Sequence, residues 1–156
     1  MWDRIKSYVY SILIALAVGG LAGLLTSSSI EIYSQLEKPP LSPPSIVFPI
    51  VWTILYILMG ISAAIIFNSN DIMKKSALKT YAVQLIINFF WTIVFFNMGW
   101  YLFAFIWLLL LLAVVIIMVV QFYKIKPLAA WLQIPYVLWL LVAAYLNYMV
   151  YVLNAA

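Results

Sequence analysis

The sequence predicts an all-α membrane protein, a five-transmembrane-helix bundle that forms a single domain over residues 1–156. Hydrophobic residues make up 69% of the chain and charged residues only 8%, whereas a soluble domain averages about half and about a quarter. Five apolar stretches are each long enough to cross about 30 Å of hydrocarbon as a helix. They are residues 7–26, 46–67, 78–96, 100–121 and 128–153. Little chain remains for a soluble domain, so we expect the function to reside within the bundle.

The first stretch, residues 7–26, follows a short basic lead and contains Gly19, Gly20 and Gly23. It is too long for the apolar region of an ordinary signal peptide and lacks a convincing cleavage site, so we interpret it as a membrane span. Small residues at Gly-x-x-x-Gly spacing let two helices approach closely in lipid. The glycines therefore predict either a contact face within the monomer, which we favour, or a dimer motif.

The longest connection, residues 27–45, contains four prolines between Pro39 and Pro44. Proline does not continue a helix and favours stiff, extended backbone. The segment is therefore either a simple linker or a rigid lid over the mouth of the bundle.

The second and third stretches each carry a face that mixes aromatic and small or amide residues. Trp52, Tyr56 and Gly60 recur at i, i+4 and i+8 and share one helix face. In the third stretch, Gln84 and Asn88 do the same. Amides are costly against lipid, so we expect them to face the bundle interior, a neighbouring helix or a ligand.

The fourth stretch is almost wholly aliphatic over residues 108–120, which predicts lipid-facing or plain core positions. In the fifth, Pro135 is expected to bend the helix. Around it lies a further stripe, made of Tyr136, Trp139, Ala143, Asn147 and Tyr151. Trp52, Trp91 and Trp139 lie well inside their spans. A pocket lined by such aromatic faces suits a flat, largely apolar ligand better than a small ion.

Histidine and cysteine are both absent, which excludes thiolate catalysis, disulfides, a Ser-His-Asp triad and Cys/His metal sites. We expect no metal and no cofactor. The charged residues lie outside the predicted spans, except Lys79 at the mouth of the third. An ion-coupled transporter keeps ionisable groups within the membrane, so the sequence argues against that class.

The charge of +4 sets topology and gives no indication of nucleic-acid binding. Only Lys38 lies on one side of the predicted bundle. The other basic residues share the opposite side: Arg4, Lys6, Lys74, Lys75, Lys79, Lys124 and Lys126. The positive-inside rule places the N-terminus in the cytoplasm and the C-terminus outside. We expect an integral multi-pass protein of a bacterial cytoplasmic membrane.

Several sequence blocks occur in a fixed order along the five stretches. They are the glycines of residues 19–23, Tyr33 with the proline pairs, Pro49-x-Val51-Trp52-Thr53-x-Leu55-Tyr56, Gln84-Leu85-x-x-Asn88-x-x-Trp91, and Ile134-Pro135-Tyr136-x-Leu138-Trp139 before Ala143-x-Tyr145-Leu146-Asn147. In these blocks the chain resembles the TspO/translocator-protein family, also called tryptophan-rich sensory proteins or peripheral-type benzodiazepine receptors.

The resemblance implies a five-helix bundle, commonly dimeric, that binds porphyrins such as protoporphyrin IX in a pocket beneath the first loop. Many relatives also bind sterols and synthetic ligands. The matching positions are Tyr33, Pro44, Trp52, Asn88, Trp91, Trp139, Ala143 and Leu146. Trp52 and Trp139 are those that any porphyrin photochemistry would use. The implied partners are a porphyrin or other flat hydrophobic ligand, the lipid bilayer and a second copy of the chain.

Two departures limit this transfer. The family commonly has an aromatic residue between its proline pairs, where this chain has Leu41. The sterol-recognition pattern of some members needs a basic residue near the C-terminus, but none follows Lys126.

Three functions follow as hypotheses. The first is a receptor or carrier that binds a tetrapyrrole for sensing, transport or disposal. The second is light-dependent porphyrin degradation in the same pocket, because without His, Cys or a carboxylate inside the spans ordinary acid–base or nucleophilic catalysis lacks its usual groups. The third is a structural partner that associates with other membrane helices.

Overall fold

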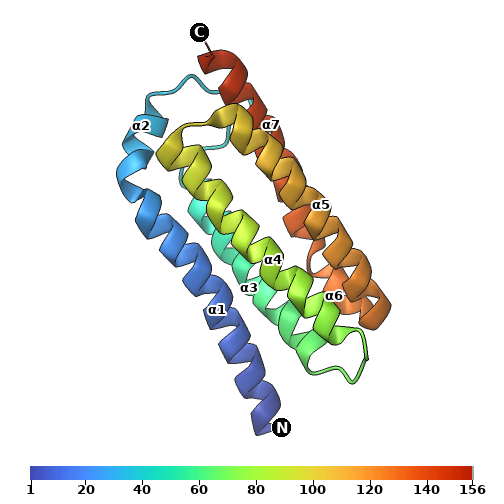
Figure 1. Ribbon diagram of the computed structural model, residues 1–156. Coiled ribbons are helices and arrows are strands. Elements are labelled where there is room, and N and C mark those ends of the chain that lie inside the picture. The colour runs from blue at the N-terminus through green and yellow to red at the C-terminus, as the bar shows by residue number, and fades with distance from the viewer. Residues whose placement is uncertain (156) are drawn as a thin grey trace.

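The computed structural model describes residues 1–155, and its regular elements within that range are all helical (Figure 1). Five long helices are long and apolar enough to cross a membrane. They are α1 (Trp2–Thr26), α3 (Val47–Phe67), α4 (Lys74–Thr92), α5 (Tyr101–Ile125) and α7 (Ile134–Asn154). Short elements connect them: η1 (Ser27–Ser29), α2 (Ile30–Ser34), η2 (Ile93–Met98) and α6 (Pro127–Trp131). The predicted fold class, an all-α five-helix membrane bundle, is confirmed.

Several helices extend beyond the predicted membrane spans at their charged ends. Helix α1 begins at Trp2 rather than residue 7, α4 at Lys74 rather than residue 78, and α5 continues to Ile125. Hydropathy marks where a helix leaves hydrocarbon, not where it stops, and long Lys and Arg side chains extend from such ends into water. After Thr92, α4 continues as the π-helix η2, which ends at Gly99 in a left-handed conformation with φ 65°.

The fifth predicted span is two helices, because α6 ends at Trp131 and α7 begins at Ile134. Pro135 was expected to bend one continuous helix, and that expectation is wrong. It lies in the first turn of α7, where a missing backbone N–H costs nothing. Pro127 occupies the same place in α6.

The bundle has two distinct ends (Figure 1). The N-terminus, the α3–α4 connection and the α5–α6 turn lie at one end, which therefore carries the basic residues predicted to share a side. The C-terminus, α2 and the turn between η2 and α5 lie at the other. Helix α1 packs chiefly against α3, while α5 packs against α4 and α7.

The aliphatic α5 has one face in the core and one face outside. Leu108, Leu111, Val115 and Met118 are fully buried, and Leu109, Leu110, Ile116 and Ile117 between them are exposed. The i+3 and i+4 spacing of the buried set is that of a helix face. Both predicted roles, lipid contact and core packing, are thus present on the same helix.

Helices α1 and α3 meet most closely at two glycines. A Cβ at Gly60 would lie 2.5 Å from Ile12 Cα, and one at Gly19 would overlap the Tyr56 ring. The Ser11 hydroxyl also donates to the Gly60 carbonyl at 2.7 Å. At Gly20 and Gly23, by contrast, nothing lies within 4 Å of a Cβ. The contact at Gly19 lies within the monomer, as favoured above, and the helices separate beyond it toward Gly23.

Candidate ligand cavity

A cavity of about 370 Å³ lies between α1, α3, α4, η2 and α7, beneath α2. Its volume is within the range of small-molecule sites. The lining includes no charged side chain and is largely aromatic and apolar. The residues are Leu16, Gly19, Gly20, Ala22, Gly23, Ile30, Tyr33, Phe48, Pro49, Trp52, Thr53, Tyr56, Trp91, Thr92, Phe95, Phe96, Trp139, Ala143, Leu146 and Asn147.

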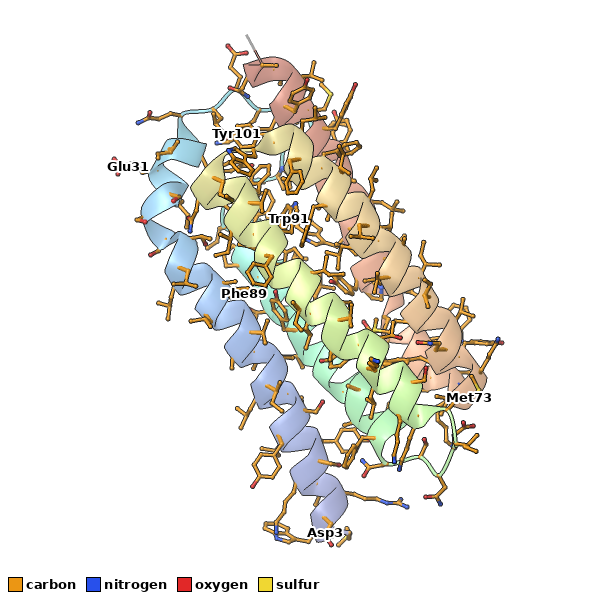
Figure 2. The ribbon with its side chains drawn as sticks, in the orientation of Figure 1. Asp3, Glu31, Met73, Phe89, Trp91 and Tyr101 are labelled. Carbon is orange, nitrogen blue, oxygen red and sulfur yellow. The ribbon has the colours of Figure 1, made fainter. Side chains whose placement is uncertain are left out.

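Trp52 lies at the centre of the aromatic wall. Its ring centroid is 5.7 Å from that of Tyr56 and 6.3 Å from those of Trp91 and Tyr136. Trp91 in turn stacks on Phe95 at 5.6 Å, and Figure 2 shows it within the bundle. Such pairs favour offset and edge-on geometries and fix one another's orientation. The wall is therefore a rigid set of ring faces.

Two hydrogen bonds hold Trp91 so that its ring face, not its N–H, is available to a ligand. The indole Nε1 donates to Asn147 Oδ1 at 3.1 Å, and Asn147 Nδ2 donates to the Tyr101 carbonyl at 2.8 Å. Both ends of this buried amide are satisfied, which avoids a penalty of about 1–3 kcal/mol for an unpartnered group. Asn147, part of the stripe predicted around Trp139, thus joins α7 to Trp91 of α4 and to Tyr101 of α5.

A buried layer of polar side chains packs against the aromatic wall on the side away from the cavity. Asn88 Nδ2 donates to the Tyr136 hydroxyl at 2.9 Å, and that hydroxyl donates to Gln84 Oε1 at 2.8 Å. All three residues are fully or almost fully buried. The layer fixes Tyr136, whose ring contacts Trp52 edge-on. Of the three surroundings left open for Gln84 and Asn88, the structure places both in the bundle interior and against a neighbouring helix.

Six of the eight predicted site residues line the cavity: Tyr33, Trp52, Trp91, Trp139, Ala143 and Leu146. Pro44 and Asn88 are not among the lining residues. Pro44 is exposed on the loop, and Asn88 is turned toward Tyr136.

Sequence reasoning did not assign Phe48, Thr53 and Phe96 to the site, although each lines it. Phe48 precedes Trp52 by one helical turn, and its ring contacts Trp139 at 5.8 Å. That spacing was a usable signal. Phe96 reaches the cavity from the π-helix η2, whose wider turn no residue pattern indicated.

The loop after α2 is tethered to α7 and to α2. The Glu37 backbone N–H donates to Asn154 Oδ1 at 3.1 Å, and Asn154 Nδ2 donates to the Glu37 carbonyl at 2.9 Å. Lys38 Nζ lies 4.8 Å from the centre of the Tyr33 ring, which contacts Phe96 at 5.3 Å. We call this tethered segment the roof loop. Helix α2 contributes to the cavity lining and the loop does not, so the lid interpretation stays a prediction.

The cavity opens sideways between α1 and α3. Gly20, Gly23, Pro49 and Thr53 line it and are nevertheless exposed. Because no atom lies within 4 Å of a Cβ at either glycine, nothing fills the gap there. All four residues belong to helices that are long and apolar enough to span a membrane, so this opening faces hydrocarbon.

One buried donor at the cavity lacks an acceptor. Trp139 Nε1 has no hydrogen-bond partner among residues 1–155. That nitrogen is itself buried, so Trp139 offers the cavity its ring and not its N–H. Within the same range, no group of three His, Cys, Asp or Glu residues could hold a metal ion.

Comparison with known proteins agrees with this architecture. The profile of the TspO/MBR family matches residues 11–153. The chain belongs to the TspO/MBR family. It is 37% identical over 154 residues to the tryptophan-rich protein TspO of Archaeoglobus fulgidus, covering 97% of this chain and 99% of that protein. It is 35% identical over 143 residues to protein CrtK of Rhodobacter capsulatus, covering 90% and 89%.

A further relative is the translocator protein of Ovis aries, 37% identical over 122 residues, with 74% of this chain and 70% of that protein covered. The sequence resemblance to this family is confirmed. Membership and the five apolar helices together make the chain an integral membrane protein.

Proposed function

We propose that this TspO/MBR protein is a membrane receptor or carrier that binds a flat, largely apolar ligand of the porphyrin type. The observation that carries the proposal is the cavity itself, walled by the rings of Trp52, Trp91 and Trp139 and free of charged lining. Flat aromatic ligands gain dispersion and ring–ring contact on such walls, whereas small ions gain nothing there.

Three features suit a tetrapyrrole in particular. The sideways opening between α1 and α3 admits an apolar ligand from the bilayer and lets part of a macrocycle project from the cavity. The Trp139 ring lines the cavity and offers a further face for stacking on a macrocycle. Lys38, the basic residue at the roof, stands 4.8 Å above the Tyr33 ring and is placed to meet an acidic side chain of the ligand.

The same proposal assigns an orientation. The positive-inside rule puts the basic, N-terminal end in the cytoplasm, so the cavity lies in the outer half of a bacterial cytoplasmic membrane. Names of relatives refer to sensing and translocation. In this proposal, ligand binding by this chain serves sensing or transport.

Binding of protoporphyrin IX in the dark tests the proposal. The purified protein in detergent is titrated while tryptophan emission and porphyrin absorbance are recorded together. We expect saturable binding that weakens in the variant Trp52→Phe/Trp139→Phe. The matched control is Trp100→Phe/Trp131→Phe, which removes two exposed indoles outside the cavity and the same number of emitters. Uptake that never saturates, equal in all three proteins, rejects porphyrin binding and favours a helix-association partner.

Light-dependent porphyrin breakdown is a second candidate. It is favoured by the 6.3 Å separation of the Trp52 and Trp91 rings beside the ligand space, because indoles are the oxidisable groups there. The bound complex is illuminated in the presence of oxygen. Loss of the porphyrin spectrum faster than for free porphyrin, and slowed by Trp52→Phe, would establish it. A rate equal to that of free porphyrin leaves binding alone.

A further inference from the structure

A second cavity of about 430 Å³ lies at the opposite, basic end of the bundle. We call it the basal groove: the hollow between residues 3–14 of α1, residues 63–67 of α3 and residues 78–81 of α4. It shares no lining residue with the aromatic cavity. The close contact of α1 with α3 at Gly60 lies between the two.

The basal groove exists because α1 is held at a distance from small side chains of α3. Helix α1 is tethered to α3 at two levels, by the Ser11 bond to the Gly60 carbonyl and by Asn68 Nδ2 donating to Ser7 Oγ at 2.7 Å. Between these levels α3 contributes Ala63, Ala64 and Phe67 to the lining. Beside the two alanines the methyl groups do not fill the space that the tethers define, so it is left to a ligand or to lipid.

Charged groups stand at the mouth of the groove. Asp3 and Lys6, one helical turn apart on α1, both line it, and Figure 2 shows Asp3 at this end. The same end of the bundle also carries Arg4, Lys75 and Lys79, against Asp71, and none of these four lines the groove. Lys74 is engaged by the carbonyls of Phe67 and Ser69. Positive charge exceeds negative at this end, and a basic surface around a hollow between membrane helices favours an anionic headgroup.

The inner wall is aromatic and apolar. The Tyr81 side chain lines the groove and is only 8% exposed. Its ring centroid lies 6.4 Å from that of Phe122 on α5, and its hydroxyl is buried, without a hydrogen-bond partner within residues 1–155. The wall therefore offers an acyl chain ring and methyl surface, and the polar groups of the groove are those at its mouth.

We infer that the basal groove binds one anionic glycerophospholipid. Its phosphate pairs with Lys6, and a headgroup hydroxyl donates to Asp3. One acyl chain then lies along α1 toward Ile14, a path of about 12 Å for eight helical residues. Moving the acyl chain from bulk lipid into the groove gains no hydrophobic free energy, because bulk lipid is equally apolar. Selectivity must therefore come from the headgroup.

The test measures lipid retention by native mass spectrometry of the intact protein released from detergent. Phosphatidylglycerol is compared with phosphatidylcholine of identical acyl chains. We expect one retained phosphatidylglycerol per chain and a preference that Lys6→Gln lowers about fivefold, the loss expected for one surface cation at about 1 kcal/mol. The control Lys126→Gln removes a basic residue of the same end that does not line the groove, and it should leave the preference unchanged.

A second pair of variants tests the acyl path. Ile14 lines the groove at 59% exposure, while its neighbour Leu13 is 55% exposed and does not. Ile14→Trp should abolish retention of the lipid, and Leu13→Trp should preserve it. Equal loss in Lys6→Gln and Lys126→Gln would show a general surface field and overturn the site. Retention in Ile14→Trp, or displacement of the lipid by inorganic phosphate, would overturn it too.

Discussion

Substituting Gly60 with alanine should separate α1 from α3 and lower the stability of the bundle. The new Cβ would lie 2.5 Å from Ile12 Cα and 2.8 Å from Ile12 N, both backbone atoms that cannot rotate away. Ordinary contact begins at 3.4 Å, so the helices must part by about 0.9 Å. Overpacking of this kind costs about 1–3 kcal/mol. The Ser11 hydrogen bond to the Gly60 carbonyl would stretch as well, a further loss of about 1 kcal/mol.

Gly20→Ala is the matched control, because nothing lies within 4 Å of its Cβ. Both substitutions raise helix propensity equally, so the difference between them isolates the steric term. Unfolding is followed by circular dichroism as dodecyl sulfate is added to detergent-solubilised protein. We expect Gly60→Ala to be about 2–4 kcal/mol less stable than Gly20→Ala. Equal stability of the two variants would refute the close contact at Gly60.

Three further outcomes follow from the site. Gly23→Phe narrows the opening between α1 and α3 and should slow porphyrin association several-fold in stopped-flow mixing. The control Ala17→Phe changes an exposed residue of α1 outside the cavity lining and should leave the association rate unchanged. Equal association rates in the two variants would exclude access by this route. Asn154→Ala removes both of its hydrogen bonds to the roof loop, each worth about 1 kcal/mol. The backbone amide hydrogens of that loop should then exchange with solvent about tenfold faster or more. Unchanged hydrogen exchange would show that these two bonds do not hold the loop. Because the chain has no native cysteine, single Lys38→Cys and Lys75→Cys variants report topology with a membrane-impermeant maleimide. In intact cells the maleimide should label Lys38→Cys and leave Lys75→Cys unlabelled. Labelling of Lys75→Cys alone would show the opposite orientation in the membrane.

The fold could be predicted from the sequence because length and hydropathy decide it. A stretch of about 20 apolar residues has to be a helix in a bilayer, where each backbone polar group needs an internal partner. The ends could not be predicted in the same way. Hydropathy drops at Lys74 while the helix is already formed, and nothing in the composition of residues 93–98 distinguishes a π-helix from an α-helix.

The aromatic part of the site could also be predicted, while its polar part could not. Trp52 and Trp91 are large and lie mid-span, so a helix face is enough to turn them inward. Asn88 lies on the same face as Trp91 but meets Tyr136 of α7 before it meets the cavity. Which of two interior neighbours an amide reaches depends on how the helices cross, and one helix alone does not encode that.

Glycines show the same limit. Gly19 and Gly23 have the same spacing signal, but Gly19 lies against the Tyr56 ring and Gly23 lies at an opening. Small residues permit close approach without specifying it. The partner helix decides which of them becomes a contact and which becomes a gap.

The most direct test of the central claim places a larger side chain inside the cavity and measures porphyrin binding. Ala143 lines it and is 8% exposed, whereas its neighbour Val142 is 41% exposed and does not line it. Protoporphyrin IX is titrated in the dark into the unmodified protein, Ala143→Phe and Val142→Phe, with far-UV circular dichroism to verify folding. The account predicts that Ala143→Phe weakens binding at least tenfold and that Val142→Phe binds like the unmodified protein. Equal affinity in all three would contradict a ligand site between the tryptophans.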